Sequence, residues 1–155
     1  MLTHRLRGRC PSATKICTVD LNDHELLWQK SSKDGSAKCD IVTSEGSFVW
    51  GVVFEIAEDE RMALDKAEGV GFGYERSPVV LSDTVNRFSA VTYKATSIDR
   101  TLKPYCWYKE LVIAGAYEHE LPSTYVEMLE AVEFVNDPDR NRRAKNNQLM
   151  VKSIS

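Results

Sequence analysis

Two carboxylates close the last turn of a predicted helix. Residues 58–68 contain strong helix formers and end with Asp65 and Glu68, and Gly69 follows at the position that suits a C′ residue. The negative end of a helix dipole destabilises an ionised carboxyl group, so an acid placed there is suited to accept a proton. The alternative is a solvated surface acid that bears a cost on the order of a few tenths of a kcal/mol. On residue chemistry alone, the surface acid is favoured.

Alternating glycines follow this helix at Gly69, Gly71 and Gly73. A phosphate-cradling loop connects a strand to a following helix, whereas these glycines leave a helix and lead into a predicted strand at 74–81. The order argues against a nucleotide site. What the glycines provide is backbone freedom at a helix exit, with room for a ligand to approach closely.

Cysteine and histidine side chains show no metal-ligand spacing. The four cysteines form no CxxC pair and indicate reduced thiols in a cytoplasmic protein, and the three histidines are equally dispersed. We therefore expect no metal site. These residues are Cys10, Cys17, Cys39, Cys106, His4, His24 and His119.

The elements that must position the two acids begin with the segment from Phe48 to Ile56. Its β-branched and aromatic residues predict a strand that is buried on both faces, and Gly51 indicates a bulge or a close approach by another group. A turn at Glu45 and Gly46 is expected to lead into it. Further strands are predicted at 13–19, 25–29, 39–43, 74–81 and 88–96.

Helices are predicted at both ends of the chain. A short one over 1–9 carries Arg5, Arg7 and Arg9, which we interpret as a solvated helix end. Two more follow in the second half, one leading in from residue 104 and one over 122–135. The aromatic residues Tyr105, Trp107 and Tyr108 could line a pocket or belong to the core, and the residues alone favour the core. We expect one domain over 1–135 and a polar tail or short surface helix over 136–155.

Composition excludes several function classes. The chain has 155 residues, 43% hydrophobic and 28% charged, which is ordinary for a globular domain. Its net charge of −3 gives no general attraction for nucleic acid or anionic lipid. No apolar run reaches transmembrane length and no signal segment is visible, so we expect no membrane partner. A nucleic-acid module built on the N-terminal arginines and basic tail is a distant alternative that salt-dependent binding would test.

Three separated blocks together resemble the gamma-glutamylcyclotransferase family. They keep that family's order and approximate spacing over most of the chain, which makes the signal specific. The resemblance implies an α+β fold, a small mixed β-barrel or sheet flanked by helices. The blocks are 2–13; 49–54 with 64–70 and Tyr74; and 108–109 with 113–116, 121–122 and Tyr125.

The resemblance also implies roles for individual residues. Glu68 takes the position of the family's catalytic glutamate, and Tyr74 and Tyr108 match tyrosines that line its substrate pocket. Met1 and Leu2, next to the expected position of the substrate-binding loop, are assigned to substrate contact as well. No cofactor and no metal are implied, and a homodimer is compatible with the resemblance. The residues assigned to structure are Asp65, Trp50 and Tyr125.

The main departure from the family lies at the start of the chain. The family's first strand ends in a Tyr-Gly-Ser-Asn loop that holds the substrate, whereas this sequence begins at Met1 and Leu2. Our hypothesis is that the start has been set too late, so that the first strand and its loop are missing. Genomic sequence without in-frame Tyr-Gly-Ser-Asn codons upstream would refute it. If the truncation is genuine, the polypeptide can be inactive.

The implied reaction is an intramolecular aminolysis. The α-amine of a γ-glutamyl group attacks its own γ-carbonyl, which closes 5-oxoproline and releases the attached amino acid or amine, with Glu68 as general acid and base. The alternative is a non-catalytic domain that binds a small molecule or a partner and retains the fold. The sequence leaves the identity of the leaving group open.

Overall fold

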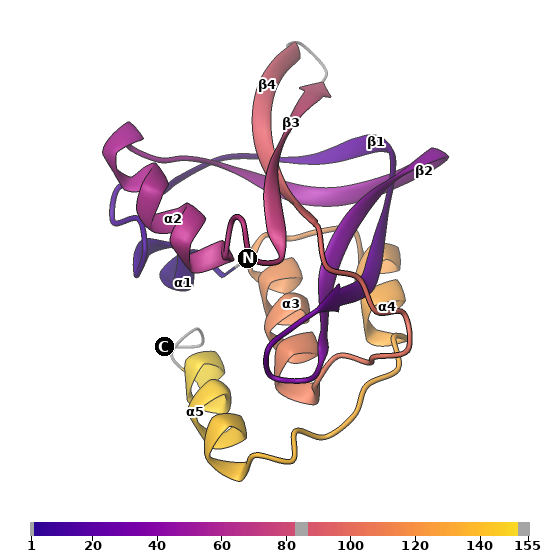
Figure 1. Cartoon of the computed structure of the whole chain (residues 1–155). Helices are drawn as coiled ribbons and strands as arrows, with labels where there is room; N and C mark the ends of the chain where they lie inside the picture. Colours follow the sequence, from indigo (N-terminus) through magenta and orange to yellow (C-terminus); the bar gives the residue numbers. More distant parts are fainter. Residues whose placement is uncertain (1, 83–86, 152–155) are drawn as a thin grey trace.

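The computed structural model describes residues 2–82 and 87–151, which form two long antiparallel hairpins flanked by helices (Figure 1). Helices α3 and α4 lie on one side of the first hairpin, and α1 and α2 gather at its other end. The elements in chain order are α1 (Thr3–Arg7), β1 (Thr14–Ser31), β2 (Ala37–Glu55), the 3-10 turn η1 (Glu58–Glu60), α2 (Arg61–Glu68), β3 (Tyr74–Ser82), β4 (Arg87–Ala95), α3 (Cys106–Glu118), α4 (Ser123–Glu130) and α5 (Arg140–Val151).

Strands β1 and β2 are longer than the sequence predicts. The strands expected at 13–19 and 25–29 are parts of β1, and those expected at 39–43 and 48–56 are parts of β2. The prediction of four short strands is therefore wrong. Each strand continues because its partner supplies a hydrogen-bonding ladder along its whole length, and local composition does not report that partner.

The expected turn before the central strand is an irregularity inside β2. Pairing passes from Asn22↔Phe48 to His24↔Thr43, so β2 accommodates extra residues opposite β1 at this point. Gly46, with φ of 74°, lies in this stretch and adopts the left-handed conformation that glycine tolerates. Extra residues of this kind bend a strand without ending it.

Burial of the central strand is only partly as expected. Val53 packs in the cluster between the two hairpins, while Trp50 packs on the opposite side against α3 and α4. Phe48 is 52% exposed, so the prediction of burial on both faces is wrong at the start of the segment. It lies beside the β2 irregularity, where regular pairing resumes.

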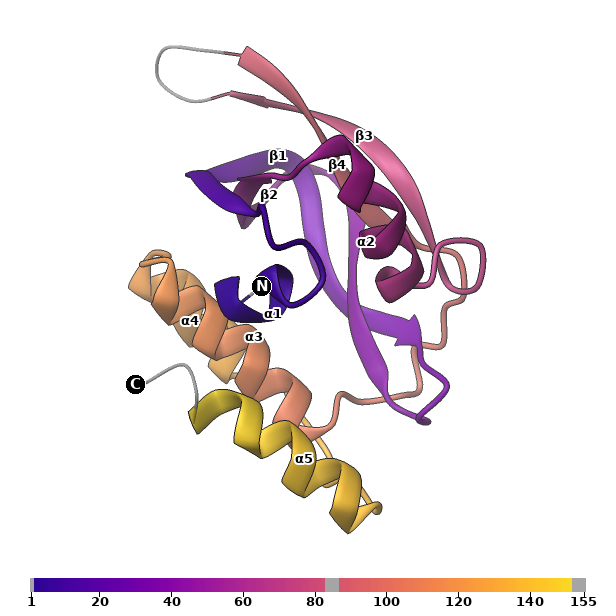
Figure 2. The ribbon, with the colours of Figure 1, turned by 90° about the vertical axis from the view of Figure 1, so that its left-hand side faces the viewer.

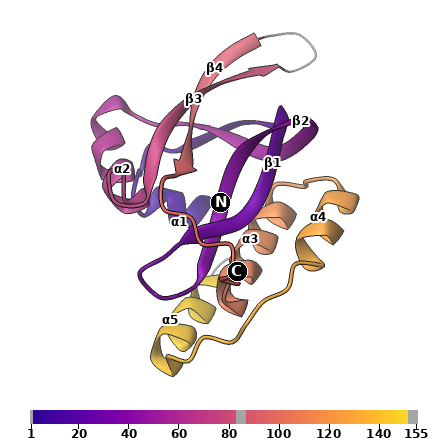
Figure 3. The ribbon, with the colours of Figure 1, turned by 45° about the vertical axis from the view of Figure 1, so that its right-hand side comes forward.

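The second hairpin confirms the strands predicted at 74–81 and 88–96. Its β3 and β4 pair in continuous register and extend beyond β1 and β2 (Figure 3). Val79 and Leu81 face inward and pack on Val19 and Leu21 of β1. Within residues 2–82 and 87–151 the strands make two two-stranded sheets. The α+β class is confirmed, and no closed barrel forms among the described strands.

Helices α3 and α4 cover the other face of the first hairpin. Tyr125 and Leu129 of α4 are buried, and Trp28 and Trp50 of the hairpin pack against them. The helix expected over 122–135 ends earlier, at Glu130. None of the helices in the described part of the chain is long and apolar enough to cross a membrane.

The early end of α4 is stabilised by a buried lysine. The Lys109 ammonium donates to the carbonyl oxygens of Glu130 (2.6 Å) and Val132 (2.7 Å), which satisfies acceptors left free where the helix stops. Lys109 lies on the neighbouring helix α3. The segment around 104–135 is closed by backbone bonds between Cys106 and Val135 and between Val135 and Pro104.

Helix α5 over Arg140–Val151 follows residue 135. Asp137 precedes it and is only 2% exposed. Its carboxylate accepts hydrogen bonds from the Trp107 indole (2.8 Å) and from two nitrogens of Arg142 (2.7 and 2.6 Å). These bonds attach α5 to the start of α3. The domain boundary at residue 135 stays a prediction.

Candidate functional site

Helix α2 ends at Glu68 as the sequence predicts. Gly69 adopts φ of 76°, and the Val70 amide donates to the Asp65 carbonyl at 3.0 Å, which closes the last turn. This is the hydrogen-bond pattern of a glycine-terminated helix, and it needs the left-handed conformation at Gly69. The closed turn places Glu68 at the negative end of α2.

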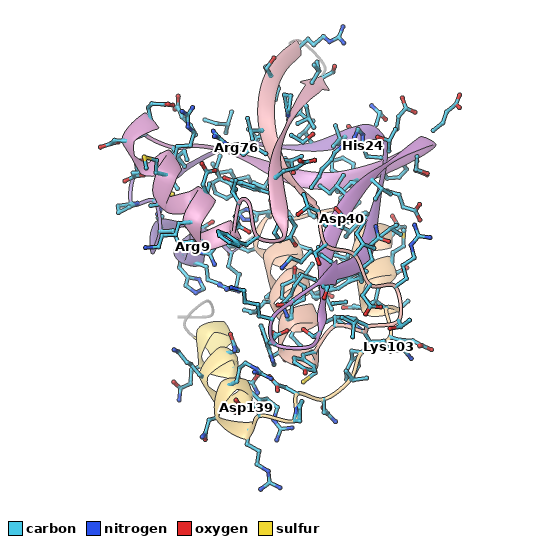
Figure 4. The ribbon with its side chains drawn as sticks, in the orientation of Figure 1. Arg9, His24, Asp40, Arg76, Lys103 and Asp139 are labelled. Atoms are coloured by element: carbon cyan, nitrogen blue, oxygen red, sulfur yellow. The ribbon has the colours of Figure 1, made fainter. Side chains whose placement is uncertain are left out.

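Glu68 forms an ion pair with Arg9. The Arg9 Nη1 atom lies 2.6 Å from Glu68 Oε1, and the two side chains are 28% and 21% exposed. The Arg9 amide donates to the Leu6 carbonyl at 2.9 Å, so the turn that ends α1 carries the guanidinium to α2 (Figure 4). Within the described chain, Glu68 Oε2 accepts no hydrogen bond. One carboxylate oxygen is therefore available to a ligand.

Asp65 has a structural role one turn earlier. Its Oδ1 atom accepts a hydrogen bond from the Tyr93 hydroxyl at 2.9 Å, and Arg76 Nε lies 3.6 Å from Oδ2. Burial, and then the bond to Asp65, raise the pKa of Tyr93 above its usual range. These contacts attach α2 to the β3–β4 hairpin, on which Figure 4 labels Arg76. They hold the helix that presents Glu68.

Tyr74 and Tyr108 bind the two backbone groups of one β2 residue, Cys39. The Tyr74 hydroxyl donates to the Cys39 carbonyl at 2.6 Å, and the Cys39 amide donates to the Tyr108 hydroxyl oxygen at 3.1 Å. Burial raises the pKa of both tyrosines above the usual range, so both hydroxyls stay protonated at neutral pH. The Tyr108 hydroxyl also forms a side-chain hydrogen bond with the Cys39 thiol, which helps to raise the pKa of Tyr108.

Aromatic packing fixes the orientation of Tyr108. Its ring meets Trp28 and Trp107 edge-on, with centroids 5.8 and 6.0 Å apart. The Lys38 ammonium lies 4.8 Å from the Tyr108 ring centroid, and burial lowers the pKa of that lysine. Tyr105 and Trp107 are core residues, as residue chemistry alone predicts.

Two further basic side chains lie near Glu68. Arg5 on α1 is half-buried; desolvation, and then the neighbouring Arg9, lower its pKa, while Tyr108 and Glu68 act in the opposite direction. The Lys30 ammonium lies 5.0 Å from the Tyr74 ring centroid, and its pKa is lowered chiefly by desolvation. Sequence reasoning missed all these contacts. The four-residue spacing of Arg5 and Arg9 in the helix predicted over 1–9 was the available signal, although α1 ends at Arg7; Lys30 had none.

The glycines after α2 make room for Lys30. Gly73 has φ of 147°, and a Cβ atom there would lie 2.9 Å from Lys30 Cε. The sequence predicts room for a ligand at these glycines; at Gly73 the Lys30 side chain occupies that room, and the approach of a ligand stays a prediction. A side chain at position 73 would displace the ammonium from its place over Tyr74.

The substrate-contact role of Met1 and Leu2 stays a prediction. Leu2 is 1% exposed and packs against Tyr105, Trp107 and Leu111, so its side chain belongs to the core. Met1 lies outside the described residues. No described group of three or more His, Cys, Asp or Glu side chains is placed to hold a metal ion.

Two hollows in the surface lie away from Glu68. One, of about 360 Å³, is lined by β1 residues and Arg100, and another, of about 200 Å³, lies between α3 and the end of α4. Neither is lined by Glu68, Tyr74 or Tyr108. We place the candidate site at Glu68 because a carboxylate, two buried tyrosine hydroxyls and several cations lie near one another there, whereas the hollows bring together no such set.

The chain is similar to several known proteins. The profile of the AIG2-like family matches residues 48–129. The chain is similar to the gamma-glutamylcyclotransferases of Homo sapiens and Mus musculus, at 32% and 31% identity, over 86% of this chain and 74% of each relative. It is also similar to a solved structure of gamma-glutamyl cyclotransferase, with a TM-score of 0.85, 27% identity, and coverage of 97% of this chain and 92% of that one.

Proposed function

Because the chain belongs to the AIG2-like, gamma-glutamylcyclotransferase-like family, we propose that it cyclises a γ-glutamyl group to 5-oxoproline and releases the attached amino acid or amine. The observation that carries the proposal is Glu68, a carboxylate fixed at the end of α2 with one oxygen bound by Arg9 and the other available. A general base needs that combination of a fixed position and a free lone pair.

The chemistry requires two protons to move from the ring nitrogen to the leaving nitrogen. Glu68 takes the first proton from the substrate α-ammonium, and the resulting amine attacks the γ-carbonyl carbon, forming the ring C–N bond. Glu68 gives this proton to the leaving nitrogen, and the bond from that carbon to the leaving nitrogen breaks. Glu68 then takes the second proton from the ring nitrogen and passes it to the departing amine, which leaves as an ammonium ion. Ring closure within one molecule needs little beyond positioning, because its effective molarity is high. Arg9 positions the carboxylate for both transfers.

Tyr108 is the candidate donor for the oxyanion. The tetrahedral intermediate carries negative charge on the former γ-carbonyl oxygen, and a hydrogen-bond donor aimed at it lowers the barrier. The Tyr108 hydroxyl accepts from the Cys39 amide, and in this proposal its proton exchanges the bond with the Cys39 thiol for one with the oxyanion. Tyr74 binds the carbonyl of the same residue, Cys39, and so fixes the strand at which both hydroxyls meet.

The test is 5-oxoproline release from a panel of γ-glutamyl amino acids and amines. We expect release by the wild-type chain and a loss of about 10²- to 10⁴-fold in Glu68→Gln, the range of general acid–base catalysis. Glu75→Gln is a matched control, because Glu75 is an exposed glutamate on β3. Near-wild-type release by Glu68→Gln would remove Glu68 from the mechanism. Binding of the panel without release would favour the non-catalytic binding domain.

A further inference from the structure

Two cations near Glu68 have no counter-ion of their own. Arg5 and Lys30 are each partly buried, yet within residues 2–82 and 87–151 neither donates a hydrogen bond nor forms an ion pair. Their charged neighbours are satisfied: Arg9 pairs with Glu68 at 2.6 Å, and Lys38 pairs with Asp34 at 2.8 Å. Desolvating a cation without a partner is costly, so the arrangement favours anionic ligand groups.

The positive charge matches a substrate with two carboxylates. A γ-glutamyl amino acid carries the α-carboxylate of its glutamyl group and a second carboxylate on the leaving amino acid. A γ-glutamyl amine or amide lacks the second. Two unpaired cations therefore fit the first kind of substrate, whereas the second kind would leave one cation without a partner.

The position of Lys30 assigns it to the outer carboxylate. Its side chain lies along Gly73 and over Tyr74, and Phe72, the residue before Gly73, is 83% exposed. Lys33 is an exposed lysine close to Lys30 in the chain, and its ammonium lies 5.9 Å from the Phe72 ring centroid. Arg5 instead lies on α1, with Arg9 and Tyr108 among its titratable neighbours. Lys30 is thus the cation toward solvent, where the leaving group departs, and Arg5 is the inner one.

We propose that Lys30 is the specificity-determining residue of this site and binds the free carboxylate of the leaving amino acid. The inference rests on the proposed function and deepens it by naming the charge that the leaving group must carry. The Tyr74 ring face binds the Lys30 ammonium, and Gly73 leaves room for the Lys30 side chain because it has no Cβ atom.

The first test is a comparison of two substrates that differ in one charge. We expect wild-type kcat/KM for γ-glutamyl-alanine to exceed that for γ-glutamyl-alanine amide by about 10- to 100-fold, the value of a charge-assisted contact. In Lys30→Met the ratio should fall below about threefold, and Lys30→Arg should restore most of it. Lys33→Met is the matched control and should retain the wild-type ratio. An unchanged ratio in Lys30→Met, or an equal loss in Lys33→Met, would overturn the proposal.

The second test does not depend on turnover. Titration calorimetry measures binding of the same two ligands to Glu68→Gln, with and without Lys30→Met, so that the ligand stays intact. If the difference in affinity between the two ligands disappears with Lys30→Met, the role of Lys30 is supported. This holds even if the wild-type chain releases no 5-oxoproline, because that result would refute only the proposed function. Turnover without discrimination would refute only the role of Lys30. Absence of binding by both ligands would overturn both.

Discussion

Two carboxylate–guanidinium pairs in this molecule have opposite surroundings. Asp137 is fully enclosed and accepts hydrogen bonds from the Trp107 indole, from two nitrogens of Arg142 and from the Asp139 amide. Glu68 is partly exposed and accepts one hydrogen bond, from Arg9. The first pair joins α5 to α3, and the second lies at the end of α2 among further cations.

The difference separates a structural acid from a reactive one. A carboxylate whose lone pairs are all occupied is stabilised as the anion and has no position left for a ligand proton. A carboxylate held by one contact keeps an oxygen free for proton transfer while its position is fixed. We expect substitutions at Asp137 to affect stability and those at Glu68 to affect chemistry.

Glu68→Gln should give the largest effect, the loss of about 10²- to 10⁴-fold in 5-oxoproline release stated above. Its folding should change little, because a partly exposed ion pair contributes roughly 0–1 kcal/mol. For a chain of this size that corresponds to a shift of about 4 °C or less in the thermal midpoint. A large fall in the thermal midpoint would show that Glu68 stabilises the fold as Asp137 does, and the distinction between the two acids would then be wrong.

Asp137→Ala should show the reverse behaviour. Removing the carboxylate leaves the Trp107 indole N–H buried without an acceptor and frees Arg142, at a cost of about 2–4 kcal/mol in unfolding free energy. Urea unfolding measures this loss, and the circular dichroism of the folded baseline reports whether α5 stays docked. Unfolding free energy within about 0.5 kcal/mol of wild type would contradict the structural role.

Acid should weaken the same pair. Hydrogen bonds from Arg142, with further bonds from Trp107 and the Asp139 amide, lower the pKa of Asp137 from its ordinary value of 3.8 to about 2. Because the folded value is the lower one, this contribution is present above about pH 4 and is lost as pH falls toward 2. The unfolding free energy of wild type should therefore fall more steeply than that of Asp137→Ala over pH 4 to 2. Parallel pH profiles would refute the linkage.

Asp139→Ala should give the smallest effect. Asp139 Oδ1 accepts the amide N–H groups of Asn141 and Arg142, both at 3.0 Å, at the start of α5. Loss of such a cap costs about 1 kcal/mol, measurable as a lower thermal midpoint. Asp139→Asn keeps a capping oxygen and should remain near wild type. Equal losses in the two variants would point to the charge of Asp139 and not to capping.

Local signals predicted the elements around Glu68 well. The glycine after the helix, the alternation in 74–81 and 88–96, and the proline before α4 each act within a few residues, and the structure confirms all three. The lengths of β1 and β2 could not be predicted in this way. A long antiparallel strand is stabilised by its partner, so polar stretches that look like loops in isolation stay in the ladder.

The sequence by itself determined which residue is the candidate base, because the helix end, the following glycine and the family resemblance all coincide at Glu68. Only the tertiary structure decided what surrounds it. Arg9 precedes Glu68 by 59 residues, and Lys30 reaches the site from another strand. Nor did the polar stretch after residue 135 indicate that Asp137 would be buried against Trp107. Periodicity and propensity describe neighbours along the chain, whereas these contacts depend on how distant segments pack, and that packing sets the charge around the acid.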